Sequence, residues 1–125
     1  MQENDIAKQV VDAAYQVHVS LGPGLLESVY EAALEYELTS RGMAVSRQTS
    51  IPITYKGIDL GEGFKADLII EDLVILELKS VEAVAPVHTK QLLTYLRLTN
   101  RKLGLLINFG ARRIKDGITR VVNGL

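Results

Sequence analysis

Two apolar runs joined by a short acidic turn, within residues 64–80 (FKADLIIEDLVILELKS), place the strongest constraint on how this chain can fold. Both runs are rich in Ile, Leu and Val, and with the turn they predict an antiparallel β-hairpin in the core of the protein. A buried hairpin would be expected to carry apolar side chains throughout. This one contains Asp67, Glu77 and Lys79, which are therefore the first candidates for a functional site.

The length of the turn decides how these charges are arranged. A two-residue turn of Glu71 and Asp72 would spread them over both faces of the sheet, because side chains on a strand alternate. A three-residue turn, or a bulge of the same effect, sets Asp67 opposite Glu77 and separates charge from core, so we predict this register. One face then carries Lys65, Asp67, Ile69, Ile75, Glu77 and Lys79, and the other carries Ala66, Leu68, Ile70, Val74, Leu76 and Leu78.

Two carboxylates that face each other across strands repel. At a separation of about 4 Å and an effective dielectric of about 20, the repulsion is roughly 4 kcal/mol. Lys79 relieves part of it, and a divalent cation would relieve more, since carboxylate oxygens suit Mg²⁺ or Mn²⁺. The residue types alone leave a second interpretation open, in which Asp67, Glu77 and Lys79 form a partly buried ion-pair cluster without a ligand.

The composition indicates one compact domain over residues 1–125, with 47% apolar residues to build its core. No uncharged apolar run approaches the length of a membrane span, and the first residues lack the pattern of a secretory leader. The chain has no cysteine, which excludes disulfides, thiolate-held clusters and a cysteine nucleophile. We therefore expect a cytoplasmic protein.

The charges are unevenly distributed although the net charge is only −1. Residues 1–40 carry one basic and seven acidic side chains, whereas residues 81–125 carry eight basic and two acidic ones. This asymmetry is compatible with a phosphate-facing surface built from the C-terminal part of the chain. It is equally compatible with mutual neutralisation of the two halves within one domain.

Hydrophobic periodicity and turn residues predict the order of elements along the chain. The pattern favours an α/β fold with a mixed central sheet flanked by helices. The expected elements are helices over 3–20 and 25–40, strands over 45–55, 60–70 and 73–79, a helix over 85–100, a strand over 102–109, and a small hairpin within 112–122.

Two helical motifs add polar candidates. Gly24, Glu27 and Tyr30 follow one another at steps of three at the start of the second helix. For Glu27 an ordinary explanation exists, because an acidic residue in the first turn caps free N–H groups and complements the helix dipole.

The second motif lies in the helix over 85–100, where His88, Gln91 and Tyr95 share one face at i, i+3 and i+7. Gln91 and Tyr95 could equally form a local surface pair. His88 is a single histidine without a second one at the spacing of metal ligands, so we expect it at the surface or at the border of a site.

Taken together, these blocks resemble the PD-(D/E)XK nuclease superfamily, and within it the GxxExxY proteins. The resemblance rests on GPGLLESVYE, KADLIIED, ILELKS, QLLTYLRL and GLLINFG, in this order over nearly the whole chain. It implies a restriction-endonuclease-like αβββαβ core, here with an extra N-terminal helix and a small C-terminal hairpin. One departure is Ala66, which stands where the name of the superfamily has proline.

The resemblance also implies a metal site. Asp67 and Glu77 would bind Mg²⁺, with Mn²⁺ as a substitute, together with the backbone carbonyl of Leu78. Glu27 would match the helical carboxylate that completes the site directly or through water.

For the remaining candidates the resemblance implies roles in the reaction. Lys79 would orient or activate the attacking water, and Gln91 and Tyr95 would border the site and contact the phosphate. The implied function is a metal-dependent phosphodiesterase acting on nucleic acid, specifically a DNA endonuclease, and the expected oligomer is a homodimer. The alternative is a binding module for nucleic acid or protein that keeps the fold but has little or no hydrolytic activity.

Overall fold

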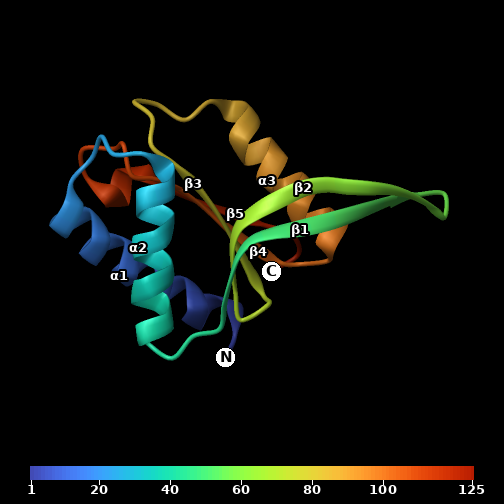
Figure 1. Cartoon of the computed structure of the whole chain (residues 1–125), viewed down its shortest axis with the longest axis horizontal. Helices are drawn as coiled ribbons and strands as arrows, with labels where there is room; N and C mark the ends of the chain where they lie inside the picture. Colours follow the sequence, from blue (N-terminus) through green and yellow to red (C-terminus); the bar gives the residue numbers. More distant parts are fainter.

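The computed structural model describes residues 1–125 as one five-stranded sheet with three α-helices (Figure 1). Every predicted helix and main strand is present, with bounds within two residues of the expectation. None of the helices combines the length and the apolar character needed to cross a membrane. The elements are α1 (Glu3–Leu21), α2 (Glu27–Ser40), β1 (Val45–Tyr55), β2 (Ile58–Ile70), β3 (Val74–Lys79), α3 (Pro86–Thr99), β4 (Leu103–Asn108), the 3₁₀ helix η1 (Ile114–Gly117) and β5 (Ile118–Val122).

The strands are ordered β1-β2-β3-β4-β5 in the sheet. β3 and β4 are parallel and the other neighbours are antiparallel. A parallel pair needs a crossover connection, and α3 supplies it. Helices α1 and α2 cover one face of the sheet and α3 covers the other, so the mixed sheet flanked by helices is confirmed (Figure 1).

The register of the β2–β3 hairpin is the odd one that separates charge from core. Residues 71–73 form the three-residue turn, which the Leu73 N–H closes by donating to the Ile70 carbonyl at 3.0 Å. Continued by one position, the register sets Asp67 opposite Glu77. The paired residues are Ile70 with Val74, Ile69 with Ile75, and Leu68 with Leu76.

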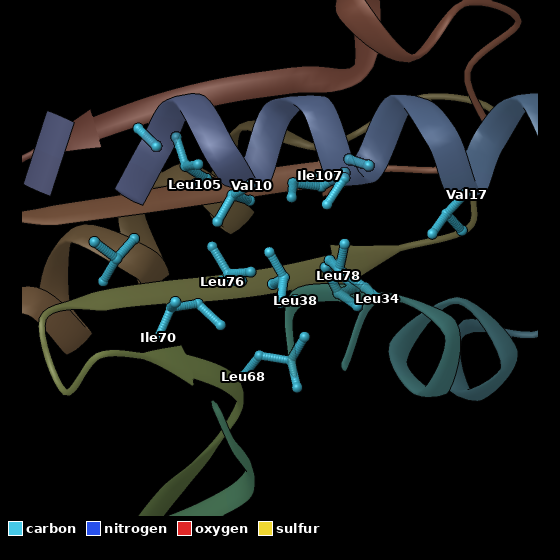
Figure 2. Packing of buried hydrophobic residues seen from close by; sticks show 14 of the residues in the cluster. Val10, Val17, Leu34, Leu38, Leu68, Ile70, Leu76, Leu78, Leu105 and Ile107 are labelled. Atoms are coloured by element: carbon cyan, nitrogen blue, oxygen red, sulfur yellow. The ribbon is translucent and has the colours of Figure 1, made fainter. Parts of the chain in front are cut away.

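A cluster of 20 buried residues fills the space between the sheet and the helices α1 and α2. Figure 2 shows Val10 of α1 and Leu34 of α2 among side chains of β2, β3 and β4. A second cluster of eight buried residues lies beneath α3 and includes Ile69, Ile75 and Leu92. The two cores fix the sheet from both faces and leave the charged residues of β2 and β3 at the border between them.

One predicted face assignment is wrong. Ala66 was expected beside Leu68 and Ile70, but it packs in the smaller cluster with Phe64, on the side of α3. Side chains along β2 therefore do not alternate regularly between the two faces of the sheet at Asp67, which lies between Ala66 and Leu68. Its neighbour on β1 is Gln48, which has a left-handed backbone (φ 50°) and so breaks the regular pleat.

The C-terminal tail also differs from the prediction. Residues 112–122 do not form a hairpin of their own, because residues 114–117 form η1 and β5 pairs with β4. Ile114 is buried in the larger core, which draws the chain inwards before β5 begins. β5 then covers an edge of β4 that would otherwise expose unpaired backbone groups.

The distal halves of β1 and β2 extend beyond the rest of the protein as a two-stranded arm (green, at the right of Figure 1). All residues from 54 to 63 are exposed. β1 is the outer strand, so its far side faces no other strand of this chain.

Tyr30 shapes the connection between α1 and α2. Its ring stacks on Phe109, with centroids 4.5 Å apart and planes 5° from parallel. Its hydroxyl donates to the Gly22 carbonyl and accepts from the Leu25 N–H at 3.1 Å. The last residue of the Gly24–Glu27–Tyr30 motif thus holds the loop that leads into Glu27.

Replacing Tyr30 by Phe should lower the free energy of unfolding by about 1–2 kcal/mol, because the ring stays in place while two loop hydrogen bonds lose their buried partner. Urea titration followed by circular dichroism measures this. Tyr36→Phe is the matched control, since Tyr36 is 76% exposed and should show no significant change. Equal stability of Tyr30→Phe and wild type would contradict the role given to the hydroxyl.

Candidate active site at the β2–β3 fork

The candidate site lies where β2 and β3 diverge. The paired residues end at Leu68 and Leu76, so that the next free N–H group of β3, at Leu78, has no backbone acceptor on β2. The Asp67 side chain takes this place, and its Oδ2 accepts from the Leu78 N–H at 2.8 Å. The fork therefore requires an acceptor side chain at this position, and the carboxylate is held against the β3 backbone.

Glu77 lies beside Asp67 in an unfavourable environment for a charge. Its Oε1 is buried and has no hydrogen-bond partner. Burial, and after it the neighbouring Asp67 charge, raise the pKa of Glu77 to about 9, while Lys79 acts in the opposite direction. Without a cation, Glu77 is therefore protonated at neutral pH.

Lys79 is half-buried two residues further along β3, on the same face as Glu77. Its ammonium makes no ion pair, since the six salt bridges of the structure all involve arginine. The closed Asp–Glu–Lys ion-pair cluster is thus not formed. Glu77 and Lys79 share one face of β3, the Asp67 carboxylate is held against the β3 backbone, and one Glu77 oxygen is left without a partner.

A divalent cation fits this pair of carboxylates. Both supply the hard oxygen atoms that Mg²⁺ and Mn²⁺ prefer, and the unpartnered Oε1 of Glu77 would gain the partner that it lacks. Mg²⁺ is commonly bound by one or two carboxylates and keeps several waters. Asp67, Glu77 and the Leu78 carbonyl could therefore hold it.

Glu27 stands apart from this pair. It is exposed in the first turn of α2 and borders a hollow together with Leu25 and Ser80, the residue after Lys79. No three acidic or histidine side chains gather closely enough to hold a metal ion by themselves.

Helix α3 borders the site through Tyr95. Its ring stacks on Phe64, with centroids 3.7 Å apart and planes 2° from parallel. Burial, and then the charges of Glu77 and Asp67, raise the pKa of the Tyr95 hydroxyl. Gln91 lies exposed one turn earlier on the helix.

His88 lies at the start of α3 and is half-buried rather than on the open surface. Its Nδ1 is buried and has no hydrogen-bond partner.

A family model described as the PD-(D/E)XK nuclease superfamily matches residues 4–121. The chain belongs to this superfamily. Searches of curated proteins and of solved structures returned no match. Membership agrees with the mixed sheet and its helices, which correspond to the restriction-endonuclease-like fold, and it indicates nuclease-type phosphodiester chemistry on nucleic acid.

Two further side chains, Glu31 of α2 and Gln48 of β1, are linked to Asp67 at the fork, and the sequence analysis did not single them out. Glu31 is buried on α2, one turn after Glu27. Its carboxylate accepts from Arg47 Nε at 2.9 Å and from Gln48 Nε2 at 3.0 Å, and the same Gln48 nitrogen also donates to Asp67 Oδ1 at 3.2 Å. The i, i+4 spacing of Glu27 and Glu31 was a usable signal for Glu31.

Removing the Glu77 charge should change how stability depends on pH. The folded-state pKa of about 9 lies above the ordinary 4.5, so the folded protein keeps a proton that the unfolded chain loses. Stability therefore falls as the pH rises from about 5 to about 9, by on the order of a few kcal/mol. Glu77→Gln should lack this fall in metal-free buffer, measured as melting temperature against pH.

Glu82→Gln serves as the control, since Glu82 is exposed and should leave the wild-type slope intact. Identical slopes for wild type and Glu77→Gln would mean that Glu77 is ionised in the folded protein at neutral pH.

Proposed function

We propose that this chain is a metal-dependent phosphodiesterase acting on nucleic acid, specifically a DNA endonuclease that uses Mg²⁺ and belongs to the GxxExxY group of the superfamily. The observation that carries the proposal is the Asp67–Glu77 pair at the β2–β3 fork, with a buried oxygen that lacks a partner. Membership of the nuclease superfamily supports it. The whole chain, residues 1–125, would act as one domain.

In this proposal Asp67, Glu77 and the Leu78 carbonyl would hold the cation, and Glu27 would contribute to the site through water. A cation bound there lowers the pKa of a water molecule and neutralises charge that develops on the phosphate. Because Glu77 is protonated without the ion, binding also releases a proton from this side chain.

The remaining candidates handle the water and the phosphate. The Lys79 ammonium makes no ion pair, so it is free to donate to the attacking water or to a phosphate oxygen. Tyr95 is held in place by its stacking on Phe64 and offers its hydroxyl beside the carboxylates. Gln91 offers an exposed amide one turn away.

A basic loop after β4 is the proposed contact for the nucleic-acid backbone. β3 and β4 are parallel, so their C-terminal ends meet at one end of the sheet, where the Phe109 N–H donates to the Lys79 carbonyl at 2.8 Å. Arg112 and Lys115 follow in the next turns, exposed and without ion pairs. These free cations, which line hollows next to α1, favour a phosphate backbone as substrate.

Self-association is a further part of the proposal. A chain with one proposed site would need a second copy to cut both strands of a duplex. We propose a homodimer on this basis.

The binding module with little hydrolytic activity stays as the alternative. The position of Glu27 favours it, because this carboxylate does not join the Asp67–Glu77 pair in a three-ligand cluster.

Metal binding and chemistry should be separable by two substitutions. Mn²⁺ should raise the melting temperature of wild type, with a stabilisation of about 2.7 kcal/mol at about 100 times the Kd. Asp67→Asn should lose this rise and be at least as stable as wild type without metal, since a buried charge is removed. Lys79→Ala should keep the rise but lose about 10²–10⁴-fold in the rate of DNA cleavage.

Asp59→Asn and Lys65→Ala are the matched controls on β2, and both should behave as wild type. Loss of folding in Asp67→Asn would contradict the site assignment. If Mn²⁺ stabilises wild type but wild type cleaves no DNA, the result would favour the alternative function, a binding module with little hydrolytic activity.

The basic loop gives a salt-dependence prediction. Lys115→Ala should weaken DNA binding uniformly across sequences and reduce the slope of log K against log salt by about one, because one phosphate contact is lost. Lys102→Ala is the control, since Lys102 is exposed just before β4, at the opposite end of that strand. Equal slopes for both variants would remove the loop from the proposed interface.

A further inference from the structure

Two neighbouring residues of β1 bind the same carboxylate. Arg47 Nε donates to Glu31 Oε1 at 2.9 Å, and Gln48 Nε2 donates to Glu31 Oε1 and Oε2, each at 3.0 Å. Adjacent side chains on a regular strand point to opposite faces of the sheet. Something in the backbone must therefore turn Gln48 towards the side that Arg47 faces.

The left-handed backbone of Gln48 provides this turn, with φ at 50°. Such a conformation brings Cβ close to the following carbonyl and is sterically unfavourable for any residue other than glycine. The other non-glycine residues with positive φ, Lys56, Glu71, Asp72 and Asn100, all lie in turns or at a helix end. Gln48 alone adopts it inside a strand, and glycine does not stand there.

The strained position brings the Gln48 amide to the metal-binding carboxylate. Gln48 Nε2 donates to Asp67 Oδ1 at 3.2 Å, while the Leu78 N–H donates to Asp67 Oδ2 at 2.8 Å. Both oxygens of Asp67 are thus held by donors from the two neighbouring strands. Glu31 is only 6% exposed and anchors the amide from the helix side.

We propose that Gln48 is a positioning residue, which links the buried Glu31 to Asp67 and fixes the orientation of the Asp67 carboxylate for the cation. The inference rests on the proposed function, since it assumes that Asp67 is a metal ligand. Hydrogen-bond partners of ligating carboxylates orient them, and their loss typically costs about 10–100-fold in metal affinity.

A purely structural role for Gln48 makes a different prediction. If the amide only fastened β1 to α2, its loss would lower the stability of the metal-free protein and leave metal affinity unchanged. Gln48→Gly separates the two roles, because glycine adopts a positive φ without steric cost but has no amide side chain.

The experiment is a calorimetric titration of wild type and Gln48→Gly with Mn²⁺, together with their melting temperatures in metal-free buffer. We expect Gln48→Gly to bind Mn²⁺ about 10–100-fold more weakly than wild type, with a metal-free melting temperature that is no lower. Gln48→Met, which keeps the length of the side chain but not its donor, should show the same loss of affinity and covers the case that the glycine variant does not fold.

Lys56→Gly is the matched control. Lys56 has nearly the same backbone conformation, with φ at 49°, and lies in the exposed turn of the arm. Its replacement relieves the same kind of strain without removing a site contact, so Mn²⁺ affinity should stay at the wild-type value.

Wild-type affinity in the two Gln48 variants would overturn this inference and leave the proposed function intact. A lower metal-free melting temperature of Gln48→Gly with unchanged affinity would do the same and assign a structural role. A wild-type protein that does not bind Mn²⁺ would overturn the proposed function, and this inference with it.

Discussion

The hydrogen bond from the Leu78 N–H to the Asp67 carboxylate is the contact on which the site depends. At this point β2 leaves β3, and a sheet cannot fork inside a protein without leaving backbone groups unpaired. The Asp67 carboxylate gives the Leu78 N–H an acceptor. Its charge also makes ionisation of the neighbouring Glu77 less favourable. The fold is thus completed by a group that brings negative charge into a half-buried place.

The two cores explain why this charge is tolerated. The larger core under α1 and α2 and the smaller one under α3 hold β2 and β3 from both faces, and the fork lies at their border. Replacing such buried polar groups by apolar ones is often neutral or stabilising. Retaining Asp67 with an unpartnered Glu77 oxygen is therefore easier to understand as preparation for a ligand than as a contribution to stability.

Much of this arrangement could be predicted from the sequence, since the hairpin register, the order of elements and the candidate residues follow from alternation and spacing. What could not be predicted depends on single backbone torsions and on distant packing. No glycine or other turn-forming pattern surrounds Gln48, so its left-handed backbone could not be predicted. Its contact with Asp67 and the changed face of Ala66 could therefore not be predicted either. The C-terminal strand pairs with β4 because Ile114 enters the core, a long-range contact that local turn residues do not reveal.

The irregular β1 has a consequence for the behaviour of the protein in a crowded solution. An outer strand normally offers a continuous row of N–H and C=O groups to which a strand of another chain can add. In β1 this row is interrupted by the turned backbone of Gln48 and by Pro52, where the register also shifts. The same torsion that aims an amide at Asp67 therefore also makes the base of the outer strand a poorer template for a strand of another chain.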